Sequence, residues 1–213
     1  MRKTETQSDQ RALLLRLIDE GFNKTAWHGP NLTGSIRGVG VKEAVWRSRA
    51  GRRNIAEIVV HCAYWKYAVR RRLRGDKRGS FPLQGSNWFA LPTRLTKQQW
   101  QDYAALLADE HRTLRDAIAT LPWSQLSKAA GNLREPVPHV YGAAMHDIYH
   151  AGQICTIKAL YKQATGGGCR QGTRTRRWRA QREATKAQPA VPFVTVPLCF
   201  FVLLVLTCFR YHR

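Results

Sequence analysis

The sequence lacks the features that mark several common classes of protein. The alternation of apolar and polar residues that is typical of β-strands is scarce, which disfavours an all-β fold. Residues 1–9 are polar and contain no apolar run, so a secretory signal is not expected and a cytoplasmic location is. The cysteines are odd in number and form no CxxC pair, which disfavours a disulfide framework and suits a reducing compartment: Cys62, Cys155, Cys169, Cys199 and Cys208.

Acidic residues are few: 14 Asp and Glu stand against 35 Lys and Arg, and the formal net charge is +21. Such a charge raises nucleic acid or an anionic membrane surface as partners. The densest basic run within residues 1–168 is residues 70–74, at the expected C-terminal end of a helix, where cations complement the helix dipole and stay solvated. The run has no aromatic or motif context of a nucleic-acid site, so nucleic acid is not the expected partner.

The most informative motif is a pair of histidines, His146 and His150, four residues apart. On a helix these residues lie on the same face, so their imidazoles can converge on one point. Two ligands leave a divalent ion short of coordination, and His61, beside the apolar stripe of another expected helix, is the candidate for the third. The alternative is that these are ordinary core histidines, since HxxxH without a Glu after the first His is not the protease motif.

The periodicity of the apolar residues predicts four principal helices. Residues 32–52 are ambiguous because glycines interrupt the pattern, with a short helical turn expected at about residues 41–46. A loop of some twenty residues separates the second and third helices, and its aromatic residues either line a pocket or plug the end of the bundle. The fold class expected is all-α, a four-helix bundle with a long crossover segment. The expected spans are Ser8 or Asp9 to near Gly21, Asn54 to about Arg74, Thr96 to just before Pro122, and near Tyr141 to about Ala164.

Three segments together resemble the DinB-like superfamily and its DinB/YfiT-like fold. They are VHCAYWKYAVRRRL at residues 60–73, GSNWF at residues 85–89 and HDIYHAGQI at residues 146–154. The resemblance covers roughly residues 9–165. It implies a four-helix bundle that holds a divalent metal with three histidines, one on the second helix and two from an HxxxH on the fourth.

Carried onto this sequence, the resemblance makes His61, His146 and His150 the metal ligands. Relatives include metal-dependent transferases that activate a low-molecular-weight thiol such as bacillithiol, mycothiol or glutathione. The resemblance therefore implies a divalent transition metal (Zn, Ni or Fe) and a thiol transferase-like or hydrolase-like enzyme that acts on a small-molecule electrophile. Glu57 and Gln153 lie within helical reach of the ligands and are candidates to hold the imidazoles in place, although Glu57 is equally explained as a solvated residue.

The composition changes abruptly after residue 168, so the expected organisation is a DinB-like domain at residues 1–168 and a tail at residues 169–213. The tail is first basic and then apolar, with 19 uncharged residues at 191–209, a length that suits one membrane span. Two prolines shorten its secure helical part to about residues 198–209, which is too short to span a bilayer. The tail is therefore either a membrane anchor or a frameshifted or read-through end of a soluble protein.

Three functions from different classes remain open. The first is a metal-dependent enzyme that activates a thiol or a water. The second is a metal-binding bundle without catalysis, because a fold does not guarantee an activity. The third is a basic protein that is tethered to a membrane or binds nucleic acid. A homodimer is a further hypothesis, since paired bundles are common.

Overall fold

The computed structural model describes residues 2–127 and 136–166, and all its regular structure there is helical. The all-α class is therefore confirmed, and no strand occurs in the described part of the chain. The helices are α1 (Arg2–Phe22), α2 (Leu32–Ile36), α3 (Val41–Val45), α4 (Ile55–Arg74), α5 (Lys97–Thr120), α6 (Trp123–Ser127) and α7 (Pro136–Ala164).

The spans of α4 and α5 are confirmed, because local signals in the sequence set their ends. Asn54 accepts a hydrogen bond from the backbone of Glu57, whose carboxylate bonds back to the Asn54 N–H. Thr96 and Gln99 form the same reciprocal pair at the start of α5. Each pair satisfies two backbone donors that would otherwise have no partner. Gly75, with φ 77°, ends α4 in the left-handed conformation that glycine adopts without strain.

Two helix boundaries differ from the prediction, and one short helix was not expected. The first helix begins at Arg2 rather than at Ser8 or Asp9, since neither glycine nor proline interrupts the residues between. The last begins at Pro136 rather than near Tyr141. A proline in the first turn of a helix costs little, because the backbone N–H groups there have no intrahelical acceptor. The short helix α6 was not predicted.

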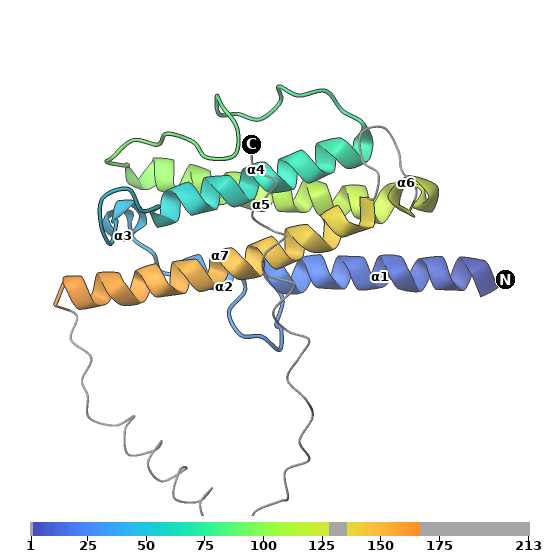
Figure 1. Cartoon of the computed structure of the whole chain (residues 1–213), viewed down its shortest axis with the longest axis horizontal. Coiled ribbons are helices and arrows are strands. Elements are labelled where there is room, and N and C mark those ends of the chain that lie inside the picture. The colour runs from blue at the N-terminus through green and yellow to red at the C-terminus, as the bar shows by residue number, and fades with distance from the viewer. Residues whose placement is uncertain (1, 128–135, 167–213) are drawn as a thin grey trace, which may run out of the picture. The chain divides into compact units, whose positions relative to one another are not determined.

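The four long helices form two layers, with α1 and α7 in one and α4 and α5 in the other (Figure 1). Helix α4 packs against both α5 and α7, and α1 likewise packs against both of these helices. The apolar core divides into two clusters. One surrounds Ile58 and Cys62 near α2 and α3, and the other surrounds Ile18 and Leu114 near α6. This arrangement brings the middle of α4 against the middle of α7.

Gly21 is the penultimate residue of α1, which ends near this glycine as predicted, and it has a packing role. A Cβ atom at this position would lie 2.9 Å from the carbonyl oxygen of Ala144 in α7. Side chains do not tolerate so short a contact with backbone, so glycine allows α1 to approach α7 closely. The position of α7 matters because it carries two of the candidate ligands.

The segment between α4 and α5, residues 75–96, crosses over these two helices without helical structure of its own, as predicted (Figure 1). Among residues 2–127 and 136–166, no helix combines the length and apolar character needed to cross a membrane. The expected tail, with its apolar stretch at residues 191–209, lies outside the described residues.

Candidate metal centre

Three histidines from two helices meet between α4 and α7. His61 lies in α4, and His146 and His150 lie one turn apart in α7. The Nε2 atom of His146 lies 3.0 Å from Nε2 of His61 and 3.1 Å from Nε2 of His150. We call these three residues the histidine triad. The structure thus brings together the three side chains that the spacing and the resemblance selected.

Hydrogen bonds on the outer ring nitrogens fix the tautomers of two of the three imidazoles. His61 Nδ1 lies 2.9 Å from the carbonyl oxygen of Asn87, which can only accept, so Nδ1 carries the proton. His150 Nδ1 donates likewise to Oε1 of Gln153 at 2.8 Å, and the Gln153 amide NH₂ donates to the Tyr149 hydroxyl. Both Nε2 atoms therefore present bare lone pairs toward His146, whose Nε2 can offer at most one proton to the two of them. A shared cation satisfies all three nitrogens at once.

Burial keeps the triad neutral. It lowers the pKa of His61 to about 4, assisted by the nearby His150 and Arg53. It lowers the pKa of His146 to about 2, assisted by the other two imidazoles and by Lys66. The pKa of His150 is also lowered by burial. Neutral imidazole is the form that binds metal, so near neutral pH no proton has to leave the triad first.

The triad fits a divalent transition metal. Imidazole nitrogens bind such ions at about 2.0–2.1 Å, so two nitrogens that share one ion lie no more than about 4.2 Å apart. The separations of 3.0 and 3.1 Å satisfy this limit. Each imidazole ligand usually donates its other N–H to a carbonyl or carboxylate, as His61 and His150 do here to Asn87 and Gln153. The structure therefore contains a buried group that can hold a metal, although three nitrogens do not identify which metal.

A turn of the crossover segment covers the triad. The Trp88 ring stacks on the His61 ring, with the centroids 3.8 Å apart and the planes within 4°. Asn87, with φ 61°, accepts a hydrogen bond from Trp65 on its side chain as well as the bond from His61 on its carbonyl. The aromatic residues here were expected from the sequence, but the role of the Asn87 carbonyl was not. The available signal was the residue type, because asparagine adopts this left-handed backbone more readily than most residues.

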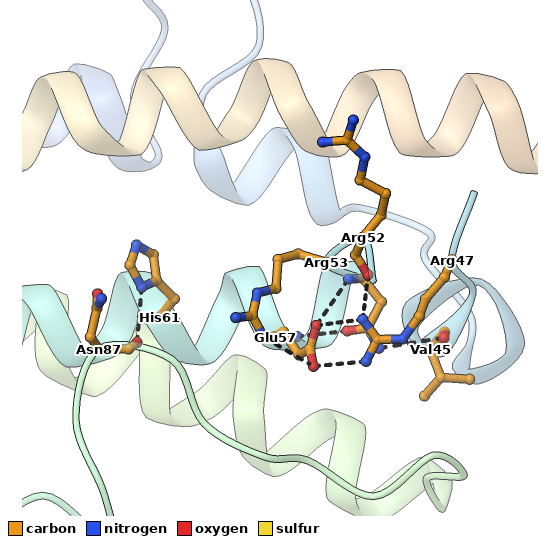
Figure 2. Close-up of polar contacts among 8 residues, drawn as sticks. Val45, Arg47, Arg52, Arg53, Glu57, His61 and Asn87 are labelled. Carbon is orange, nitrogen blue, oxygen red and sulfur yellow. Dashed lines mark hydrogen bonds and ion pairs between the residues drawn. The ribbon is translucent and has the colours of Figure 1, made fainter. Parts of the chain in front are cut away.

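The two candidates for holding the imidazoles have different surroundings. Gln153 contacts His150, as described above. The Glu57 carboxylate instead bonds Arg47 at 2.7 and 2.8 Å and the Asn54 backbone (Figure 2). Its side chain is only 5% exposed, so it is not a solvated residue either. Glu57 therefore caps α4 and ties it to the segment before it, with no hydrogen bond to the triad.

Next to the triad, a second group contains Cys62 and Asp147 together with His146. Asp147 forms an ion pair with Lys66, and both side chains are 1% exposed. Burial raises the pKa of the Cys62 thiol well above its ordinary value, so this sulfur stays protonated and is a poor ligand. The histidine triad is therefore the better metal-binding group. The buried Lys66–Asp147 pair was not predicted from the sequence.

A cavity of about 400 Å³ opens beside the triad. His150, Gln153 and Trp88 contribute to its wall, so a small molecule in the cavity lies against one of the three imidazoles. This volume is within the range of pockets that bind small molecules. The cavity therefore provides a route to the triad from one side.

The family model of the DinB superfamily matches residues 24–154, which is more than half of the 213-residue chain and includes the whole histidine triad. No curated protein matches the chain, and no solved structure does. The family match confirms the resemblance found in the sequence. The chain belongs to the DinB superfamily.

Proposed function

We propose that the histidine triad holds a divalent transition metal and that the protein is an enzyme that activates a thiol or a water. The observation that carries this proposal is the convergence of two bare Nε2 lone pairs on the Nε2 atom of His146. Three protein nitrogens leave coordination positions for a further ligand, which a catalytic site requires. When bound, such a metal lowers the pKa of a thiol or a water that joins it and so favours the nucleophilic form.

The residues of this chain have three roles in the proposed reaction. The Asn87 carbonyl and the Gln153 amide hold two imidazoles so that Nε2 faces the shared point. The Trp88 ring covers one face of His61 and keeps water from it. The cavity beside His150 receives the reactants, for which we propose a low-molecular-weight thiol or water and a small-molecule electrophile. Zinc, nickel and iron all suit a site of imidazole nitrogens.

Cobalt substitution tests whether the metal has an open position that a thiol can enter. We expect the full chain loaded with Co²⁺ to show visible absorption bands, and a small thiol to add a sulfur-to-cobalt charge-transfer band. His61→Ala should lose both signals, whereas His28→Ala, a change at an exposed loop residue, should keep them. Cobalt bands that no thiol or other added ligand alters would contradict the proposal. A screen of thiol-transfer and hydrolase substrates with the same variants then identifies the reaction.

A second candidate function is a metal-binding bundle without catalysis. The triad links α4 to α7, and two of its members, His61 and His150, are only 5% and 3% exposed. A metal there would cross-link two long helices and stabilise the folded chain. Under this alternative, removing the metal lowers the melting temperature, and no substrate in the screen is converted by the loaded protein.

A further inference from the structure

The cavity beside the triad has a positively charged wall. Arg52 and Arg53 line it, and none of its lining residues is acidic. Both arginines belong to the segment between α3 and α4, so this short connection brings two positive charges to the edge of the candidate metal centre. Two cations without a balancing carboxylate in the same cavity favour an anionic ligand.

The charge of Arg52 is not neutralised by its surroundings. Arg47, from the same segment, forms two short hydrogen bonds to the Glu57 carboxylate. Figure 2 shows the Arg52 guanidinium pointing away from Glu57, and within residues 2–127 and 136–166 no carboxylate forms an ion pair with it. Arginine binds carboxylate and phosphate groups through paired N–H donors, so a free guanidinium in a cavity is suited to such a group.

Arg53 is partly restrained by contacts with Trp88, which also covers His61, and with Glu57. Its guanidinium lies 4.6 Å from the centroid of the Trp88 ring, and its Nη1 lies 3.8 Å from the Glu57 carboxylate. The side chain remains 48% exposed, so donors are available to a ligand. Trp88 thus lies between Arg53 and His61 and connects the charged wall to the triad.

Part of the cavity lining is apolar. Ile58 of α4 and Ile157 and Leu160 of α7 contribute this part. A ligand that uses the whole cavity therefore needs an apolar body as well as a charged group. His150 lines the same cavity, so such a ligand extends to the triad.

We propose that this cavity binds a small organic anion, whose carboxylate or phosphate group pairs with Arg52 and Arg53 while its apolar body packs against Ile157 and Leu160. The proposal assigns a substrate class to the reaction proposed above. The claim that the anion is a substrate rests on that proposed function. The anion-binding part depends only on the arginines and can be tested without metal. Arg52 is the main determinant, since its guanidinium has no competing carboxylate.

The test compares the binding of matched probes to the full chain by calorimetry. The protein is first treated with a chelator, so that an anionic probe cannot bind to a metal in place of the arginines. The probes are 4-phenylbutyrate, its uncharged amide and 3-phenylpropylphosphonate. We expect one or both anions to bind about tenfold more tightly than the amide. Arg52→Gln should remove this preference. Arg94→Gln, which removes the same charge from an exposed position outside the cavity lining, should keep it.

Equal affinity for the anions and the amide, or the same loss in Arg52→Gln and Arg94→Gln, would overturn the inference. The metal content of the same preparations before chelation separates it from the proposed function. If the parent holds no metal but prefers the anion through Arg52, the proposed reaction fails and the anion site stands. If the parent holds metal but shows no Arg52-dependent preference, the anion site fails and the metal proposal stands.

Discussion

The Lys66→Met substitution tests how much the buried ion pair beside the triad contributes to the free energy of unfolding. Lys66 and Asp147 form an ion pair between α4 and α7 in which each side chain is 1% exposed. The second carboxylate oxygen of Asp147 has no hydrogen-bond partner among the described residues, and Lys66 also lies 4.9 Å from the centroid of the Phe22 ring. Removing the lysine leaves an uncompensated buried charge, which costs about 3–5 kcal/mol of the free energy of unfolding. This is a large part of a typical total of about 5–15 kcal/mol.

The loss should depend on pH. Burial raises the pKa of Asp147 from 3.8 to about 6, against the opposing effect of Lys66, so without the lysine this pKa rises further. A carboxyl with a raised folded-state pKa binds its proton more tightly in the folded protein than in the unfolded chain. Its contribution to stability is therefore greatest below the unfolded pKa and is lost as the pH rises through the folded pKa. Lys66→Met should be less destabilising at about pH 5 than at about pH 8.

Urea unfolding followed by circular dichroism measures these free energies. Lys66→Met with Asp147→Leu removes both charges, and we expect this double variant to recover most of the stability that Lys66→Met loses. Lys162→Met, at an exposed position in the last turn of α7, is the matched control and should change the stability by less than about 0.5 kcal/mol. The reasoning is refuted if Lys66→Met is as stable as the control, or if the double variant loses the sum of the two single losses.

Three further predictions concern the surroundings of the triad and the acid sensitivity of the fold. Gln153→Leu removes the acceptor of the His150 N–H and should weaken metal affinity about tenfold to a hundredfold in a competition titration; unchanged affinity would contradict this role. Asn87→Gly keeps the carbonyl that holds His61 and should retain the metal. Asn87→Val strains the backbone at φ 61° and should weaken metal binding in the same titration. Equal metal affinity of the two variants would count against the role of the carbonyl. Burial lowers the pKa of His111 from 6.5 to about 3, so the unfolded chain binds a proton at His111 more tightly than the folded protein does. The free energy of unfolding therefore falls as the pH drops from about 6.5 to about 3. His111→Phe should keep the stacking on Phe22 and flatten that part of the pH profile of urea unfolding, and a profile as steep as that of the parent would contradict this assignment.

The elements that sequence analysis predicted well are those set by local chemistry. The capping pairs at Asn54 and Thr96 lie within four residues, so their effect can be predicted without knowing the tertiary structure. The spacing of His146 and His150 likewise fixes one helical face. His61 was identified from its place beside an apolar stripe. In the structure, the packing of α4 against α7 places it next to His146.

The features that were missed depend on contacts between distant residues. Lys66 would ordinarily be solvated, and its partner Asp147 lies 81 residues away in the sequence. The Asn87 carbonyl is a backbone group, so its hydrogen bond to His61 does not follow from side-chain patterns, and the sequence signals only that an asparagine tolerates the left-handed backbone there. Glu57 has helical spacing toward His61, but Arg47, ten residues before it, provides a bidentate partner that competes successfully.

The most direct test of the central claim is the metal content of the full chain by plasma mass spectrometry. The parent and His28→Ala should each contain about one equivalent of a transition metal, and His61→Ala and His146→Ala should contain little. Absence of metal from all four proteins, even after reconstitution with Zn²⁺, Ni²⁺ and Fe²⁺, would contradict the assignment of the histidine triad as a metal centre.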